Sequence, residues 1–391
     1  MRITIPLVGL FLAFAYARPD LCTLTASGGD DAPRLLKAMK TCVTVTVPKH
    51  TTLAIGTRLN MTGLANKHLS LQGTLKFTPD VPYWSENAFP FPFQTQVTFW
   101  VLGGRNIRID GGGTLDGSGQ AWYDAFAANS STPRPIVLTI YQAKNVVVKD
   151  INMIDGPEWF NLINEGENIV YDGINIDARS TNANKIHNTD GWNVYRSNNV
   201  VIQNSNINNG DDCVAFKPNA TNVLISNLQC NGSHGISVGS LGQYDGIVDI
   251  VQNVTAINVR MSNAQNGARI KAWAGPGVGS GLVKNITFQN FNVDKVDNPI
   301  VIDQCYFTSA ANCTAFPSNV YIEDIWFTNV TGVSSGPLVA ALSCSPDGRC
   351  NDINVNDFSV VPPSGTPKLT CQNVDINGNA ATQFPLCAVT G

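Results

Sequence analysis

The chain has 391 residues, of which 43% are hydrophobic and 14% charged, so it is long enough for a sizeable core and for one to three domains. A formal net charge of −4 excludes the broad basic surface that nucleic-acid binding requires. Low charge, 34 glycines and many asparagines beside Val or Ile argue against helices and indicate an all-β protein.

The N-terminus has the pattern of a secretory signal peptide. It begins with Met1-Arg2, continues through an apolar run to Phe14, and ends in small residues that fit an A-x-A cleavage site at Ala17. The alternative is a buried N-terminal strand. No other run is long and apolar enough to span a bilayer. We therefore expect a signal peptide over 1–17 and a secreted, extracellular domain over 18–391 with no membrane partner.

Ten cysteines, an even number, fit disulfide bonds in an oxidising compartment. Zinc binding is a weaker alternative, because the chain has no C-x-x-C pair and its four histidines are scattered. The order of the cysteines suggests local pairs, namely Cys22–Cys42, Cys213–Cys230, Cys305–Cys313, Cys344–Cys350 and Cys371–Cys387. Glycosylation sequons point to the same compartment and begin at Asn60, Asn129, Asn219, Asn231, Asn253, Asn285, Asn312 and Asn329.

A repeated motif follows a Lys-rich stretch, 32–40, that is expected to form a capping helix. The motif is an Asn before Val or Ile, at Asn106, Asn145, Asn168, Asn199, Asn222, Asn253, Asn285 and Asn319. A β-sandwich with Asn in its turns is one interpretation. Bounded spacing favours a parallel β-solenoid instead, with the asparagines stacked in equivalent turns. No domain linker is visible, and the less regular stretch 345–391 is expected to be a C-terminal cap.

Acidic residues and a histidine recur at nearly the length of one solenoid coil. Asp211 follows Asp190 by 21 residues, Asp212 is adjacent, and His234 follows Asp211 by 23. Strands of successive coils lie ~4.8 Å apart, so these side chains should form one cluster. Arg269 and Lys271 are two residues apart, hence on one face of a strand, and Tyr306 completes the set.

Three neighbouring carboxylates fit a calcium site, a solvated ladder or an acid and base pair. Calcium prefers six to eight oxygen ligands, and the cations of His234, Arg269 and Lys271 would oppose it. Crowded carboxylates raise one another's pKa, so that one stays protonated while another stays ionised. Hydrolysis of a glycosidic bond requires that division. A Cys213–Cys230 bond would hold such a site rigid.

Five blocks resemble the signature of the polygalacturonase family of glycoside hydrolases, family 28. They are Asn188-Thr189-Asp190, Gly210-Asp211-Asp212, Ser233-His234-Gly235, Arg269-Ile270-Lys271 and Tyr306, in the family's order. The stretch from Cys230 to Tyr244 resembles the fungal exo-acting branch. The resemblance implies a single-stranded right-handed parallel β-helix and hydrolysis of α-1,4-linked galacturonic acid with inversion.

Roles are carried over from the resemblance residue by residue. Asp211 is the expected general acid, Asp190 and Asp212 activate the attacking water, and His234 helps to set the protonation of the acid. Inverting enzymes separate acid and base by ~6.5–9.5 Å, which neighbouring coils can supply. The expected substrate-binding residues are Asn188, Arg269, Lys271 and Tyr306, with the two cations on the substrate carboxylate. No metal and no cofactor is expected.

The sequence departs from the family at Asn193, where members often have Asp; this affects subsite detail and pH optimum. The first hypothesis is a monomeric exo-polygalacturonase acting on pectic polysaccharide, with a loop wall from an insertion within 168–199, 253–285 or 285–319. Rhamnogalacturonan is the alternative substrate. Two other classes stay open, a calcium-dependent pectate lyase and a non-catalytic carbohydrate-binding β-helix.

Overall fold

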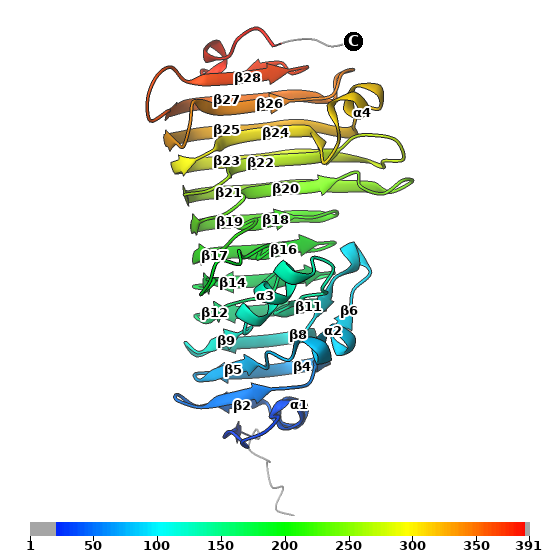
Figure 1. The fold of residues 1–391 in the computed structure, drawn as a ribbon, viewed down its shortest axis with the longest axis vertical. Helices are drawn as coiled ribbons and strands as arrows, with labels where there is room; N and C mark the ends of the chain where they lie inside the picture. Colours follow the sequence, from blue (N-terminus) through cyan, green and yellow to red (C-terminus); the bar gives the residue numbers. More distant parts are fainter. Residues whose placement is uncertain (1–20, 388–391) are drawn as a thin grey trace, which may run out of the picture.

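A computed structural model describes residues 21–387. The expected signal peptide, 1–17, lies outside the described residues. Twenty-six strands form one sheet that winds into a stack of coils, and a second small sheet joins β6, β7 and β10. Figure 1 shows the strands stacked along the long axis.

The main sheet contains the following strands: β1 (Leu21–Thr23), β2 (Thr44–Val47), β3 (Thr52–Ile55), β4 (Leu59–Leu71), β5 (Thr74–Phe77), β8 (Trp100–Asp110), β9 (Thr114–Asp116), β11 (Leu138–Lys149), β12 (Asn152–Ile154), β13 (Asn161–Asn164), β14 (Glu167–Asp172), β15 (Asn175–Asp177), β16 (Trp192–Tyr195), β17 (Asn198–Asn208), β18 (Val214–Phe216), β19 (Ala220–Asn231), β20 (Ile236–Leu241), β21 (Val248–Ser262), β22 (Asn266–Trp273), β23 (Ser280–Val296), β24 (Asn298–Tyr306), β25 (Asn319–Ser334), β26 (Leu338–Ser343), β27 (Cys350–Val361), β28 (Lys368–Gln372) and β29 (Ile376–Asn377). The remaining elements are α1 (Ala32–Thr41), α2 (Val81–Asn87), β6 (Phe89–Pro90), η1 (Phe93–Thr95), β7 (Val97–Thr98), α3 (Gln120–Ala128), β10 (Pro135–Ile136), α4 (Ala310–Ala315) and η2 (Ala381–Gln383).

Every strand of the stack pairs in parallel with the corresponding strand of the next coil. For example, β17 pairs with β19, β19 with β21, and β21 with β23. A β-sandwich of antiparallel hairpins is thereby excluded. The fold is a parallel β-helix, as predicted, and the expected capping helix is α1 at its N-terminal end.

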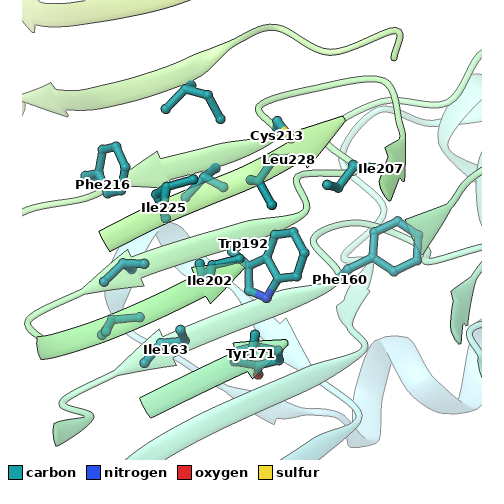
Figure 2. Close-up of a cluster of buried hydrophobic side chains, with 14 of the residues drawn as sticks. Phe160, Ile163, Tyr171, Trp192, Ile202, Ile207, Cys213, Phe216, Ile225 and Leu228 are labelled. Carbon is teal, nitrogen blue, oxygen red and sulfur yellow. The ribbon is translucent and has the colours of Figure 1, made fainter. Parts of the chain in front are cut away.

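The core is built from columns of apolar side chains, one from each coil. Strand alternation turns every second residue inward, and parallel register sets equivalent residues above one another. One column consists of Val146, Ile169, Val200, Val223, Val254, Ile286, Ile325 and Ile353, all buried. Larger side chains fill the middle coils, where Trp192 packs edge-on against Tyr171 (Figure 2).

The repeated asparagines form the predicted ladder. Their φ angles are positive, and the side-chain amide of one donates to the amide oxygen of the preceding coil, as from Asn168 to Asn145 at 2.9 Å. One break occurs at Asn222, which donates to Asn198 rather than to Asn199. The prediction for Asn319 was wrong, because that residue begins β25. Asp324, with φ 57°, holds the equivalent turn in register with Asn285.

All five predicted disulfides are present among the described residues. The expectation of irregular structure from residue 345 was wrong for part of that stretch. Strand β27 pairs with β25 over ten residue positions, and β28 pairs with β26, so the coils continue past residue 361. Polar turn residues in this segment obscure the alternating apolar positions in the sequence, although β27 still supplies buried core residues such as Ile353 and Val355.

Two insertions that project from the coils matter for the site. Residues 89–98, named the wall loop here, carry β6, η1 and β7 and follow α2. The segment 307–318 carries α4. In Figure 1 both project from the same side of the stack, α2 and β6 from the lower coils and α4 from the upper ones. Among the described helices, none has the length and apolar character needed to cross a membrane.

Candidate active site

A cleft of about 910 Å³ lies between the wall loop and the segment that carries α4. Its lining includes all eight residues singled out from the sequence: Asn188, Asp190, Asp211, Asp212, His234, Arg269, Lys271 and Tyr306. The structure therefore brings residues that are up to 118 positions apart in the chain around one cavity.

Parallel register explains why the carboxylates meet. Asp190 and Asp212 each lie two residues before a strand, and those strands, β16 and β18, pair through Trp192 and Val214. The Asn209 side chain fixes the turn that carries Asp211 and Asp212. Its amide donates to the carbonyls of Thr189, Asp211 and Asp212 at 2.9–3.0 Å. A single amide thus fastens two adjacent coils at the acidic cluster.

Asp212 is almost completely buried, and both of its oxygens are engaged. Arg269 donates to Oδ1 at 2.6 Å, and Lys271 donates to Oδ2 at 2.7 Å. Ser237 also donates to Oδ1, at 2.8 Å. Burial opposes ionisation, but the charges of Lys271 and Arg269 outweigh it, so the pKa of Asp212 lies far below its usual range. Asp212 is an ionised carboxylate held by two cations.

Asp211 faces the cleft and accepts three hydrogen bonds or contacts. The His234 ring nitrogen Nδ1 lies 3.3 Å from Oδ1, which also accepts the Asp212 backbone N–H at 2.7 Å. Asn188 donates to Oδ2 at 3.3 Å. Burial raises the pKa of Asp211, but the hydrogen bond to His234 and its charge more than offset that, so the net direction is down. The same hydrogen bond raises the pKa of His234.

The pKa of Asp190 shifts in the opposite direction to those of Asp211 and Asp212. It is buried, it has no cation in hydrogen-bonding contact among the described residues, and Asp211 and Asp212 lie close by. Burial, followed by repulsion from those two carboxylates, raises its pKa well above the usual value. Because the pKa of Asp190 is raised and that of Asp211 is lowered, a proton shared between them is favoured on Asp190.

The carboxylates form one compact cluster. One oxygen from each of Asp190, Asp211 and Asp212 lies within 4.8 Å of the others. The three side chains meet because Asp190 stacks on the adjacent coil and Asp211 and Asp212 are neighbours in sequence. The separation of ~6.5–9.5 Å between whole carboxyl groups, expected for an inverting enzyme, stays a prediction.

These three carboxylates are also the natural candidates for a metal ion. Hard cations need several free oxygen ligands. Both Asp212 oxygens already accept from Arg269 and Lys271, and burial lowers the pKa of Lys271 only to about 8. The donor set is thus committed to cations of the protein itself, and it does not fit a divalent ion.

Three further residues at the cleft were missed by sequence reasoning. Lys217 and Glu158 line the cavity, and Arg134 lies behind it, where it donates to Asn188 Oδ1 at 2.7 Å. Lys217 carried a usable signal, since it follows Asp212 by five residues as Lys271 follows Asn266. Arg134 and Glu158 lie outside the repeated blocks and carried none.

A β-helix with acidic, basic and histidine side chains around one surface cleft defines a class of enzyme that cleaves polysaccharides by acid and base catalysis. The family model described as glycosyl hydrolases family 28 matches residues 38–382. The chain belongs to glycoside hydrolase family 28.

Curated relatives and solved structures agree with this family. The chain is 46% identical over 378 residues to an exopolygalacturonase of Cochliobolus carbonum, covering 92% of this chain and 85% of the relative. It is 41% identical over 383 residues to exopolygalacturonase X-1 of Emericella nidulans, covering 93% and 88%. The endo-xylogalacturonan hydrolase structure from Aspergillus tubingensis matches with TM-score 0.85 and 31% identity, covering 92% of this chain and 99% of that one. An exopolygalacturonase structure from Thermotoga maritima, at 16% identity and TM-score 0.72 over 96% and 92%, is similar in fold.

Proposed function

We propose that the protein is an exo-polygalacturonase, which hydrolyses α-1,4-linked galacturonic acid from non-reducing chain ends with inversion. The relatives' names support the substrate. The observation that carries the exo assignment is a carboxylate cluster in a cleft that an inserted loop also lines, through Gln94 and Gln96; this loop is proposed to close one end of the cleft. Rhamnogalacturonan is kept as an outcome of the test below.

The wall loop supplies that closed end. Gln94 donates to Gln243 at 3.2 Å and so bridges from the loop to a coil far along the chain. Phe93 stacks on Tyr195 with ring centroids 3.9 Å apart and an interplanar angle of 16°. The loop is thus packed against the stack rather than free, in a position where it would bar a sugar chain from continuing past it.

The wall loop lies outside all three intervals, 168–199, 253–285 and 285–319, in which a wall was expected. Its insertion precedes Asn106, where the counted repeats begin, so the spacing of the motif did not measure it. All three intervals do border the cleft, for example through Asn188, Lys271 and Phe307.

Catalysis in this cleft would need one proton shared among the carboxylates. Asp211 would protonate the leaving oxygen, while Asp190 and the ionised Asp212 would position and activate water. The protein's own groups favour the proton on Asp190. A bound sugar chain would exclude water from Asp211 and bring carboxylate charge near it, and both effects raise the pKa of Asp211. Substrate binding would thereby move the proton to the acid.

The protein is further proposed to be secreted as a monomer after removal of residues 1–17, in keeping with relatives named for a pectic substrate. Mass spectrometry of the protein recovered from culture medium would test this. A mature N-terminus at Arg18 is the expected result, and retention of residues 1–17 would reject it.

Product analysis tests the activity itself. Early digestion of polygalacturonate, with chelator present, should release monogalacturonate, and NMR should find it first as the β-anomer. Unsaturated, ultraviolet-absorbing products would indicate a lyase. Faster release of galacturonate from rhamnogalacturonan would identify the alternative substrate, and binding without new reducing ends would indicate a carbohydrate-binding protein.

A further inference from the structure

The basic side chains of the cleft differ in what they contact. Lys217, Arg269 and Lys271 line it in the described part of the chain. Arg269 and Lys271 are both paired with Asp212, at 2.6 and 2.7 Å. Asp212 therefore offsets one of their two positive charges and occupies donors of both side chains, which leaves them a smaller share in binding a substrate carboxylate than the sequence suggested.

Lys217 has no such partner. The residue is only 5% exposed, it lines the cleft, and no acceptor or carboxylate contacts its amino group among residues 21–387. Its nearest aromatic neighbour is Trp159, whose ring centroid lies 5.2 Å from the amino nitrogen. The carboxylates of Asp190, Asp212 and Glu158 act on this ammonium group only at a distance, without a hydrogen bond or ion pair in the described part of the chain. Burial of an ammonium group without a direct partner is costly. A largely buried cation that faces a cavity and has no direct partner therefore indicates an anionic ligand.

The strand register places Lys217 in the same row as Lys271. Phe216 pairs with Val238, and the next residue on β20, Gly239, pairs with Lys271. Gly239 contributes no side chain to this row, and the charge of Lys217 acts to lower the pKa of Lys271. An anion bound in the cleft beside both amino groups would offset the repulsion between them.

The acidic groups near Lys217 are unsuited to neutralise it. Asp212 is already paired with Arg269 and Lys271, and the pKa of Asp190 is raised. Glu158 also lines the cleft, its nearest cation is Arg134 at 3.9 Å, and burial raises its pKa to about 7. Below that pH it is protonated and carries no charge. Gln94 and Gln96 of the wall loop and Gln243 opposite it line the same end of the cleft and offer amide groups to sugar hydroxyls.

We propose that Lys217 is the centre of a carboxylate-binding subsite at the closed end of the cleft, which receives the terminal acidic sugar of the substrate chain. This inference deepens the proposed function and rests on it for the identity of the sugar. Lys217 selects galacturonate over galactose at the chain end, and a methyl ester at that sugar removes the charge that Lys217 binds.

Equilibrium binding of single sugars tests the subsite without requiring turnover. NMR titrations with galacturonate and with galactose are made on the wild type, Lys217→Met, Lys217→Arg and, as a matched control, Lys284→Met. Lys284 is exposed and paired with Glu323 away from the cleft. Thermal unfolding of each variant checks that it is folded. Methionine keeps much of the length of lysine but cannot bind an anion.

The Lys217→Met variant should bind galacturonate roughly 10- to 150-fold more weakly, the range expected for lost hydrogen bonds to a charged group. Galactose binding should change by less than about threefold, and Lys217→Arg should keep most of the affinity because it keeps the charge. The inference is overturned if Lys217→Met binds galacturonate like the wild type, if both sugars weaken equally, or if the wild type does not prefer galacturonate.

A parallel digestion of polygalacturonate separates the two claims. Binding that depends on Lys217, together with no release of monogalacturonate by the wild type, rejects the proposed function alone. Normal release by both the wild type and Lys217→Met rejects the subsite alone. If Lys217→Met is unfolded, the comparison is made with Lys217→Gln. If both of these variants are unfolded, the test uses Lys217→Arg, and loss of galacturonate selectivity in that variant counts against the subsite.

Discussion

The asparagine ladder and the acidic cluster use the same device with opposite energetics. In both, one side chain per coil is placed above the next by parallel register. Stacked amides are self-complementary, because each both donates and accepts, as between Asn168 and Asn145. Stacked carboxylates such as Asp190 and Asp212 repel one another. Repetition alone stabilises the ladder, whereas the cluster needs Arg269 and Lys271 from later coils.

The largest expected effect is on turnover at the cluster. Asp211→Asn should fold normally but lose about 10²- to 10⁴-fold in kcat, because an amide cannot deliver a proton to the leaving oxygen. Asp324→Asn makes the same change in the exposed ladder turn and should leave kcat unchanged. Steady-state hydrolysis of polygalacturonate measures both, and a loss of less than a few-fold in Asp211→Asn would reject its role as the acid.

The next largest effect is expected on the free energy of unfolding of a variant at Asp212. The Asp212→Asn substitution leaves Arg269 and Lys271 buried beside each other without their counter-charge. Breaking a buried ion pair in this way costs about 3–5 kcal/mol. Urea denaturation at neutral pH should find that loss in the free energy of unfolding. A variant as stable as the wild type would mean that the two cations are solvated rather than held by Asp212.

The sequence predicted the fold and the position of the acidic cluster, but it did not predict the wall loop or which carboxylate holds the proton. Coil-length spacing was enough to place Asp190, Asp211 and His234 at one cleft, because register in a parallel stack follows directly from chain length per coil. The path of the wall loop does not repeat and so left no signal. The location of the proton was also hidden, since the pKa of Asp190 depends on burial and distances that only the folded chain defines.

Glu158 should give a pH-dependent effect on stability of up to about 3 kcal/mol, since one pKa unit corresponds to about 1.4 kcal/mol. Its pKa rises from 4.5 to about 7 on folding because of burial. The protonated form is the one that the folded state favours, so stability is lost as pH rises through that range. Glu158→Gln should therefore stabilise the protein at pH 8 and change little at pH 4. Urea denaturation at both pH values checks the sign, and equal effects at the two would contradict it.

The smallest effect is expected in the ladder. Asn168→Ala removes an exposed side chain that accepts from Asn199 and donates to Asn145. Neutral hydrogen bonds contribute about 0.5–1.5 kcal/mol each, so the loss of two should cost about 1–3 kcal/mol, with kcat unchanged. A loss as large as that of Asp212→Asn would remove the contrast between the two regions.

The proposed enzyme cleaves only at chain ends, because residues 89–98 close the cleft beside the carboxylate cluster. The most direct measurement is the viscosity of polygalacturonate at equal numbers of bonds hydrolysed, for the wild type and for a variant in which Phe91–Gln96 is replaced by a short Gly-Ser linker. We expect slow viscosity loss with the wild type and faster loss with the variant, provided that it remains folded. Rapid viscosity loss and a ladder of oligomers from the wild type would contradict a closed cleft and establish endo attack.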